Sequence, residues 1–345
     1  MNDKRLDASC YLTINKNMNR IQGSLKDILS VWRIRAEVIC FVNRLSREVL
    51  NLKSWMTHKS KIEIVKLMDM RCNCFLIRKD GITVLVDTSI RAEGSILLRR
   101  LKELNVVKLH CILLTHVHFD HTGNVRRLQK KYNCPVFVHS SEEDFLKEGF
   151  TYLPKGSMVL TKFATTLAGN RVLRFQRFPA CHDKIVTELS YNLPVEPNDV
   201  LTPADADPAL EQVEPALEQA DTALAPADAA LEQADSALAS PDDALTRVDQ
   251  ILTRVGIQIL YTPGHTVGSV SYIVDDEAAL VGDTMINPFR MELRPPFADL
   301  PDRLPASWKV LLDTHCRYFL PAHGGVVGRE LLEEHNAKAR LWRVQ

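Results

Sequence analysis

Four side chains that can bind a metal ion stand within six residues of one another, in the segment His116-Val117-His118-Phe119-Asp120-His121. The segment follows the apolar run CILLT and precedes Thr122-Gly123, a pattern that predicts a strand, a tight loop and the start of a helix. Imidazole nitrogens and carboxylate oxygens are ligands that suit borderline divalent metals such as zinc. Three imidazoles and one carboxylate at H-x-H-x-D-H spacing therefore predict a metal site on this loop.

Three further motifs follow in a set order along the chain. YTPGHTVGS contains His265, LVGDT contains Asp283 and LPAHGG contains His323. Together with the first motif, they resemble the metallo-β-lactamase superfamily. Matched position by position, the resemblance implies a ligand set of two groups joined by one bridging residue: His116, His118 and His265 for one metal ion, Asp120, His121 and His323 for the other, and Asp283 between them.

The resemblance also implies a chemistry. Two metal ions per chain, zinc in the first instance with iron or manganese as alternatives, would lower the pKa of bound water so that a bridging hydroxide exists at neutral pH. One ion would polarise the substrate carbonyl, and the metal ions or Asp120 would assist the leaving group, which makes Asp120 the candidate catalytic residue. His118 stands where the di-iron, oxygen-reducing branch of the superfamily has an acidic residue, which argues against that branch.

The expected reaction is hydrolysis of a small ester, thioester or lactone. The ligand set with a bridging Asp283 resembles the glyoxalase-II and lactonase branches of the superfamily, whereas the β-lactamase branches usually lack a bridging aspartate. Two alternatives stay open, a mononuclear iron persulfide dioxygenase of the same fold and a metal-dependent phosphodiesterase. A metal analysis separates the first alternative from a zinc hydrolase.

Strands and helices alternate along two stretches of the chain, which predicts an α/β fold. The resemblance makes this an αββα sandwich whose first part covers residues 57–195 and whose second part covers residues 253–345. Residues 1–56 carry apolar residues at helical spacing and are predicted to form an N-terminal helical extension. Since this extension carries no candidate ligand, the hypothesis is that residues 1–55 are dispensable.

Residues 196–252 are predicted to be an insertion in the domain. Leucine recurs there every seven residues, at 210, 217, 224, 231, 238, 245 and 252. A heptad repeat is typical of a coiled coil and leaves open a homo-oligomer, but Pro208, Pro215, Pro226 and Pro241 interrupt it. The pattern therefore favours a surface excursion of short helical turns. Within residues 196–249, 14 acidic side chains face one basic side chain, Arg247.

Composition narrows the choice of partners and compartment. Lys+Arg and Asp+Glu both number 43, and the acidic insertion would repel phosphate backbones, so a small-molecule substrate is expected and a nucleic acid is not. The eight cysteines show no paired CxxC spacing and are interpreted as reduced thiols. With neither a signal-peptide pattern nor a run of twenty apolar residues, the chain is predicted to be cytoplasmic, without a membrane span.

Several residues beside the ligands are candidates for supporting roles. Asp87 ends the run VLVDT and is expected to hydrogen-bond a ligand imidazole, or to cap a neighbouring loop. Thr115, Thr262, Thr266 and Thr284 flank ligands. Arg290 or Arg294 would meet a substrate carboxylate, or belong to a solvent-facing loop packed by its own prolines and phenylalanines.

Overall fold

The computed structural model describes residues 53–69, 71–152, 154, 156–158, 161, 176–187, 241–288 and 292–339. The chain divides into two units at residues 52 and 53, and the second unit holds both sheets and all the candidate ligands. Most of the predicted N-terminal extension (1–52) and residues 196–240 of the predicted insertion lie outside the described residues. Among the helices of the described part, none is both long and apolar enough to cross a membrane.

The first sheet has seven strands in chain order. They are β1 (Ser54–Met56), β2 (Glu63–Lys66), β3 (Phe75–Lys79), β4 (Ile82–Val86), β5 (Cys111–Leu113), β6 (Val136–Phe137) and β7 (Ile185–Val186). Strands β1 to β4 pair antiparallel, and β4 to β7 pair parallel. The connecting helices are η1 (Arg91–Glu93), α2 (Gly94–Glu103), α3 (Phe119–Thr122), α4 (Val125–Tyr132), η2 (Ser140–Glu142) and α5 (Glu143–Glu148).

The second sheet has five strands in the order β12-β11-β10-β9-β8. They are β8 (Ile257–Tyr261), β9 (Val270–Val274), β10 (Ala278–Gly282), β11 (Tyr318–Pro321) and β12 (Val327–Gly328). Only β10 and β11 pair parallel, and the other neighbours in this sheet pair antiparallel. The helices that follow β10 are η8 (Pro301–Arg303), α8 (Leu304–Leu312) and α9 (Arg329–Ala339).

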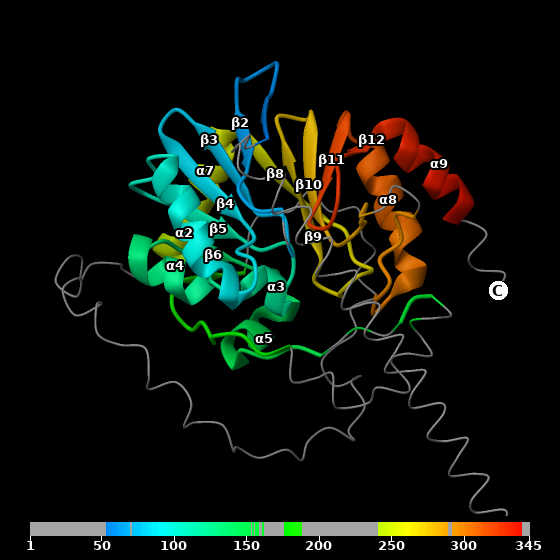
Figure 1. The fold of residues 1–345 in the computed structure, drawn as a ribbon. Helices are drawn as coiled ribbons and strands as arrows, with labels where there is room; N and C mark the ends of the chain where they lie inside the picture. Colours follow the sequence, from blue (N-terminus) through cyan, green and yellow to red (C-terminus); the bar gives the residue numbers. More distant parts are fainter. Residues whose placement is uncertain are drawn as a thin grey trace, which may run out of the picture. The chain divides into compact units, whose positions relative to one another are not determined.

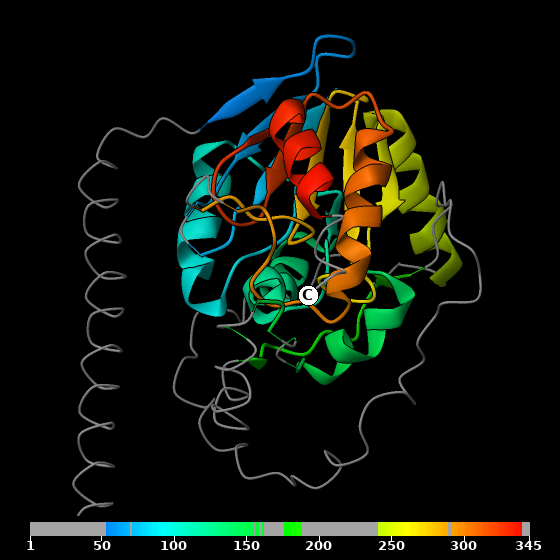
Figure 2. The same cartoon turned by 90° about the vertical axis from the view of Figure 1, so that its right-hand side faces the viewer.

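The two sheets pack face to face, with helices on their outer faces (Figures 1 and 2). The inner core joins Ile77 and Val84 of the first sheet to Ile259 and Tyr272 of the second. A separate buried cluster packs α8 and α9 on the outer face of the second sheet through Trp308, Leu311 and Leu332. Helices α2 and α4 cover the first sheet on its other side. The predicted α/β fold with αββα layers is therefore confirmed.

Helix α7 (Pro241–Val255) belongs to this domain and corrects a predicted boundary. Val248, Ile251, Leu252 and Val255 repeat at helical spacing and are buried in the inner core. The helix packs against β7 and β8, the edge strands of the two sheets. Residues 241–252, predicted from the sequence to belong to the insertion, are thus part of the packed domain.

The sequence pattern was misleading at this boundary. Pro241 was interpreted as an interruption of the heptad repeat, but the described part of α7 begins with it and runs without a break to Val255. The sheet also begins earlier than predicted, because Ser54–Met56 pair with β2 although the domain was expected to start at residue 57.

We expect Val248→Ala to lower the free energy of unfolding by on the order of 2 kcal/mol, because Val248 is fully buried and its truncation leaves a cavity between α7 and the sheets. Chemical denaturation followed by circular dichroism measures the change. Asp249→Ala, at the exposed neighbouring position, is the matched control and should change stability by less than about 0.5 kcal/mol. Equal stability of both variants would show that α7 contributes little to the core.

Candidate metal centre

The seven predicted ligands lie in the segments that follow the carboxyl ends of strands from both sheets. His116 follows β5, His265 follows β8, Asp283 follows β10 and His323 follows β11. Strands β10 and β11 are parallel, and β8 runs in the same direction as β10 because each pairs antiparallel with β9. The carboxyl ends of the strands in the second sheet therefore deliver three ligands to one place, opposite the loop that follows β5.

Three imidazoles form the first group. Nδ1 of His118 lies 2.9 Å from Nε2 of His116 and 3.0 Å from Nε2 of His265. All three side chains are buried. Burial lowers the pKa of each imidazole, to about 3 for His118, so the three rings are neutral and present ring nitrogens to one another. Neutral imidazole is the form that binds a metal ion.

Asp120, His121 and His323 form the second group. Nε2 of His323 lies 3.3 Å from Oδ2 of Asp120, and Nε2 of His121 lies 3.9 Å from Oδ1 of Asp120. Burial would lower the pKa of His121, but Asp87 and Asp120 outweigh it and raise that pKa to about 9. Burial would raise the pKa of Asp120, but His121 and His323 lower it to about 2. The carboxylates of the second group therefore stabilise a positive charge there, either on the imidazoles or on a bound metal ion.

Asp283 lies between the two groups. Its Oδ2 is 3.5 Å from Nε2 of His265 and 3.3 Å from Nε2 of His323, while its Oδ1 is 3.7 Å from Nε2 of His121. Burial would raise the pKa of Asp283, but His323 and His265 hold it well below its usual range. One ionised carboxylate therefore reaches both groups.

The donor set fits divalent metal ions. Candidate ligand atoms lie within 4.8 Å of one another in the sets His116, His118, His265; His116, His121, Asp283; and Asp120, His121, His323. Within the described part of the chain, Nε2 of His121 and Oδ1 of Asp283 are buried and have no hydrogen-bond partner. Because an unpartnered buried polar atom is costly, two such atoms at the centre of these sets are well explained as metal ligands.

The ligands are held by a second set of hydrogen bonds, and Asp87 takes part in them as its position at a strand end predicted. Its Oδ2 lies 3.0 Å from Nδ1 of His121, and its carboxylate also accepts the amide and hydroxyl of Thr115, each at 2.9 Å. On the other sheet, Nδ1 of His265 donates to the Phe297 carbonyl at 2.8 Å. Such contacts fix which ring nitrogen faces the centre.

Two glycines let the backbone pass close to the site. Gly282 has φ 51°, and a Cβ there would lie 2.6 Å from Cβ of Thr115. Gly324 has φ 96°, and a Cβ there would lie 2.0 Å from the backbone of Asn287. Any larger residue would push Asp283 or His323 away from the centre.

Three supporting residues were not predicted from the sequence. The Asn73 amide donates to the carbonyls of Pro321 and Gly324, on both sides of His323. The Cys72 thiol lies 3.7 Å from Nδ1 of His121. Glu142 is a buried carboxylate whose burial raises its pKa to about 7, although three donors oppose the shift. Each is a single residue outside any motif, so its role depends on tertiary contacts.

The arginine candidates have a different outcome. The Arg294 guanidinium donates to the Ser157 carbonyl and so ties its loop to the segment around residue 157, where Gly156 forms a bridge with Phe297. This contact supports the interpretation of Arg294 as part of a packed loop. Arg290 lies outside the described residues.

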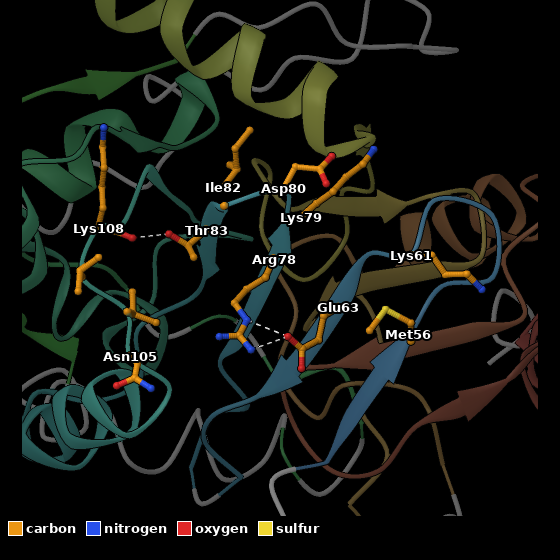
Figure 3. A pocket seen from close by; sticks show the side chains of 13 residues that line it. Met56, Lys61, Glu63, Arg78, Lys79, Asp80, Ile82, Thr83, Asn105 and Lys108 are labelled. Carbon is orange, nitrogen blue, oxygen red and sulfur yellow. Dashed lines mark hydrogen bonds and ion pairs between the residues drawn. The ribbon is translucent and has the colours of Figure 1, made fainter.

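A pocket of about 460 Å³ lies away from this centre (Figure 3). It is lined by the β3–β4 turn at Asp80–Gly81 and by Asn105–Lys108, which precede β5. These residues lie at the amino ends of β4 and β5, whereas the ligands follow the carboxyl ends. Inside the pocket Arg78 is already paired with Glu63, 2.6 Å away. The pocket is therefore not part of the candidate metal centre.

Curated relatives match only part of the chain. An uncharacterised protein of Mycobacterium leprae is 32% identical over 95 residues, which cover 27% of this chain and 43% of the relative. The probable metallo-hydrolase YqgX of Bacillus subtilis is 30% identical over 79 residues, covering 23% and 36%. Hydroxyacylglutathione hydrolase GloC of Haemophilus influenzae is 32% identical over 88 residues, covering 25% and 40%. The chain thus matches less than half the length of each relative.

A solved structure and a family model extend the comparison. An archaeal metallo-beta-lactamase superfamily protein from Sulfolobus tokodaii aligns over 80% of this chain and 85% of its own, with 18% identity and a TM-score of 0.46. The model of the metallo-beta-lactamase superfamily matches residues 67–323, which include all seven candidate ligands. The chain therefore belongs to the metallo-β-lactamase superfamily.

Proposed function

We propose that this protein is a dinuclear zinc hydrolase that cleaves a small carboxylic ester, thioester or lactone. The observation that carries the proposal is the position of Asp283, whose two oxygens lie within 3.7 Å of imidazole nitrogens from both ligand groups. A carboxylate placed in this way can hold two ions at a short, fixed separation. The three-histidine group and the Asp120, His121 and His323 group would each bind one ion.

Bound metal ions would supply a hydroxide nucleophile at neutral pH and polarise the substrate carbonyl. The exposure of the ligand side chains indicates the side from which a substrate would enter. The side chain of His121 is fully buried, whereas those of Asp120 and His323 are 17% and 26% exposed. Substrate therefore approaches from the side of Asp120 and His323.

Asp120 is the candidate group for proton transfer on that side. Its low pKa keeps the carboxylate ionised, so it can accept a hydrogen bond that orients a water molecule. Bound metal ions would lower the pKa of that water, and Asp120 would then pass its proton to a departing thiolate or alkoxide. Asp87 keeps Nε2 of His121 directed at the centre throughout, because it holds the other ring nitrogen.

Two considerations support an acyl substrate. The Haemophilus influenzae relative is named for the hydrolysis of hydroxyacylglutathione, an acylated thiol. Acyl transfer also asks little of the side chains, since the leaving groups are stable and the oxyanion is stabilised electrostatically. A phosphodiesterase would need further cationic groups for its dianionic transition state.

The proposal predicts close to two equivalents of zinc per chain. Asp283→Ala and His121→Ala should each lower the zinc content sharply, and hydrolysis with it, because each change removes a buried ligand that no neighbour replaces. Elemental analysis of the purified full-length chain measures the content. His315→Ala is the matched control, since that side chain is 89% exposed and lies outside the ligand sets. One iron per wild-type chain would instead favour the persulfide dioxygenase.

The substrate class predicts an order of kcat/KM on a matched panel. With the zinc-loaded protein at neutral pH, at least one thioester, ester or lactone should exceed every phosphodiester and β-lactam by on the order of 100-fold, which corresponds to about 2.7 kcal/mol of transition-state stabilisation. Initial rates across the panel measure the order. Faster turnover of a phosphodiester or β-lactam than of every acyl substrate would overturn the substrate class and leave the metal site untouched.

A further inference from the structure

Glu142 joins the two loops that carry the three-histidine group. It ends η2, and its side chain is buried at 3% exposure. One carboxylate oxygen, Oε2, accepts the backbone N–H of Val117. The other, Oε1, accepts the hydroxyl of Thr266 and, at 3.1 Å, the backbone N–H of Gly268. Three donors from two loops therefore meet on a single carboxylate.

Those two loops come from different sheets. Val117 lies between His116 and His118 on the loop that follows β5, and Thr266 lies next to His265 on the loop that follows β8. The sheets are also joined at the ends of these strands, where the amide of Val270 donates to the Thr115 carbonyl at 2.9 Å. Glu142 adds a second tie, directly beside the ligands.

The space around Glu142 shows how closely the second loop fits it. A Cβ on Gly268 would lie 2.6 Å from Cγ of Glu142 and 2.7 Å from Oγ of Ser141. The loop is also held from within, because the Thr266 amide donates to Oγ of Ser269 at 3.0 Å. Because little free space remains between them, a displacement of the Glu142 carboxylate would also displace the His265 loop.

The choice of a carboxylate also points to a geometric role. An apolar side chain of similar volume would stabilise the fold without the cost of burying a charge. It could not accept N–H groups from both loops. Glutamine could accept with only one oxygen, because its amide nitrogen is a donor facing other donors.

We propose that Glu142 is a positioning residue that sets the separation of His118 and His265 and thereby the geometry of the three-histidine metal site. The two ring nitrogens concerned are 3.0 Å apart. This inference rests on the proposed metal centre, but it does not depend on the substrate. Glu142 touches neither the ligand side chains nor a reacting group and acts through the backbone of both loops.

The test is titration of the metal-depleted full-length chain with Co²⁺, followed by visible absorption and by competition with a chelator. Glu142→Gln should weaken one of the two Co²⁺ sites by on the order of 10- to 100-fold and change the intensity of its d–d bands, while the other site keeps wild-type affinity. Glu148→Gln, at an exposed position in the same segment, is the matched control and should titrate as wild type.

A second variant keeps the test independent of folding. Thr266→Val preserves the shape of the side chain and removes one of the three donors to Glu142, together with the 2.8 Å hydrogen bond between Oγ1 of Thr266 and Oγ of Ser269. It should weaken the same Co²⁺ site by a smaller factor, about 3- to 10-fold. Thr253→Val, exposed on α7, is its control. Circular dichroism and the melting temperature report folding in parallel. If both variants bind two Co²⁺ ions with wild-type affinity and spectrum, or lose stability alone, the proposal is overturned.

The outcomes also separate this inference from the function proposed above. Wild-type protein that binds two Co²⁺ ions but hydrolyses no acyl substrate would refute the substrate class, and the effect of Glu142→Gln on the first site would still decide the role of Glu142. Wild-type protein that binds no Co²⁺ would refute both the metal centre and the inference.

Discussion

Five imidazoles and two carboxylates lie close together at the ends of strands whose inward faces form an apolar core. Removing such groups from water costs free energy unless each finds a partner. The αββα core makes the arrangement possible, because both sheets bury continuous apolar faces and deliver their ligands only where the strands end. This cost of burying polar groups explains why the site lies at the strand ends. It also explains the hydrogen bonds that hold the ligands and their loops.

The two halves of the site meet this cost of burial in different ways. In the three-histidine half, burial keeps the rings neutral, so little charge has to be compensated. In the other half, the carboxylates of Asp87, Asp120 and Asp283 face His121 and His323. Their negative charge favours a positive charge at this place, either a metal ion or a protonated imidazole. The carboxylates of Asp120 and Asp283 would compensate metal ions, and that of Asp87 orients His121. One half of the site therefore offers neutral imidazoles at fixed positions, and the other half offers carboxylates that compensate positive charge.

The alternation of strands and helices predicted the α/β class. The αββα layers and the set of clustered side chains followed from the family resemblance, which His116 to His121, His265, Asp283 and His323 carry in short motifs at strand ends. The role of Asp87 was also accessible, since it directly follows β4, at the end of the strand from which the sequence predicted a contact with a ligand imidazole. Glu142 and Asn73 were not accessible, because their partners are backbone groups more than twenty residues away along the chain.

The segment after residue 240 was misassigned for a related reason. Its leucines continue a heptad spacing that begins upstream, and a seven-residue repeat and an amphipathic core helix share much of the same periodicity. Only the packing of Val248 and Val255 between the sheets distinguishes the two. Periodicity reports that one face of a helix is apolar, but it does not report which surface covers that face.

Helix α7 also fixes where the rest of the domain begins. It is anchored on both sheets, and only nine residues separate its end from His265, so the position of this ligand is fixed from α7 onward. A change in the length of the chain before residue 241 therefore need not alter the position of β8 or of His265.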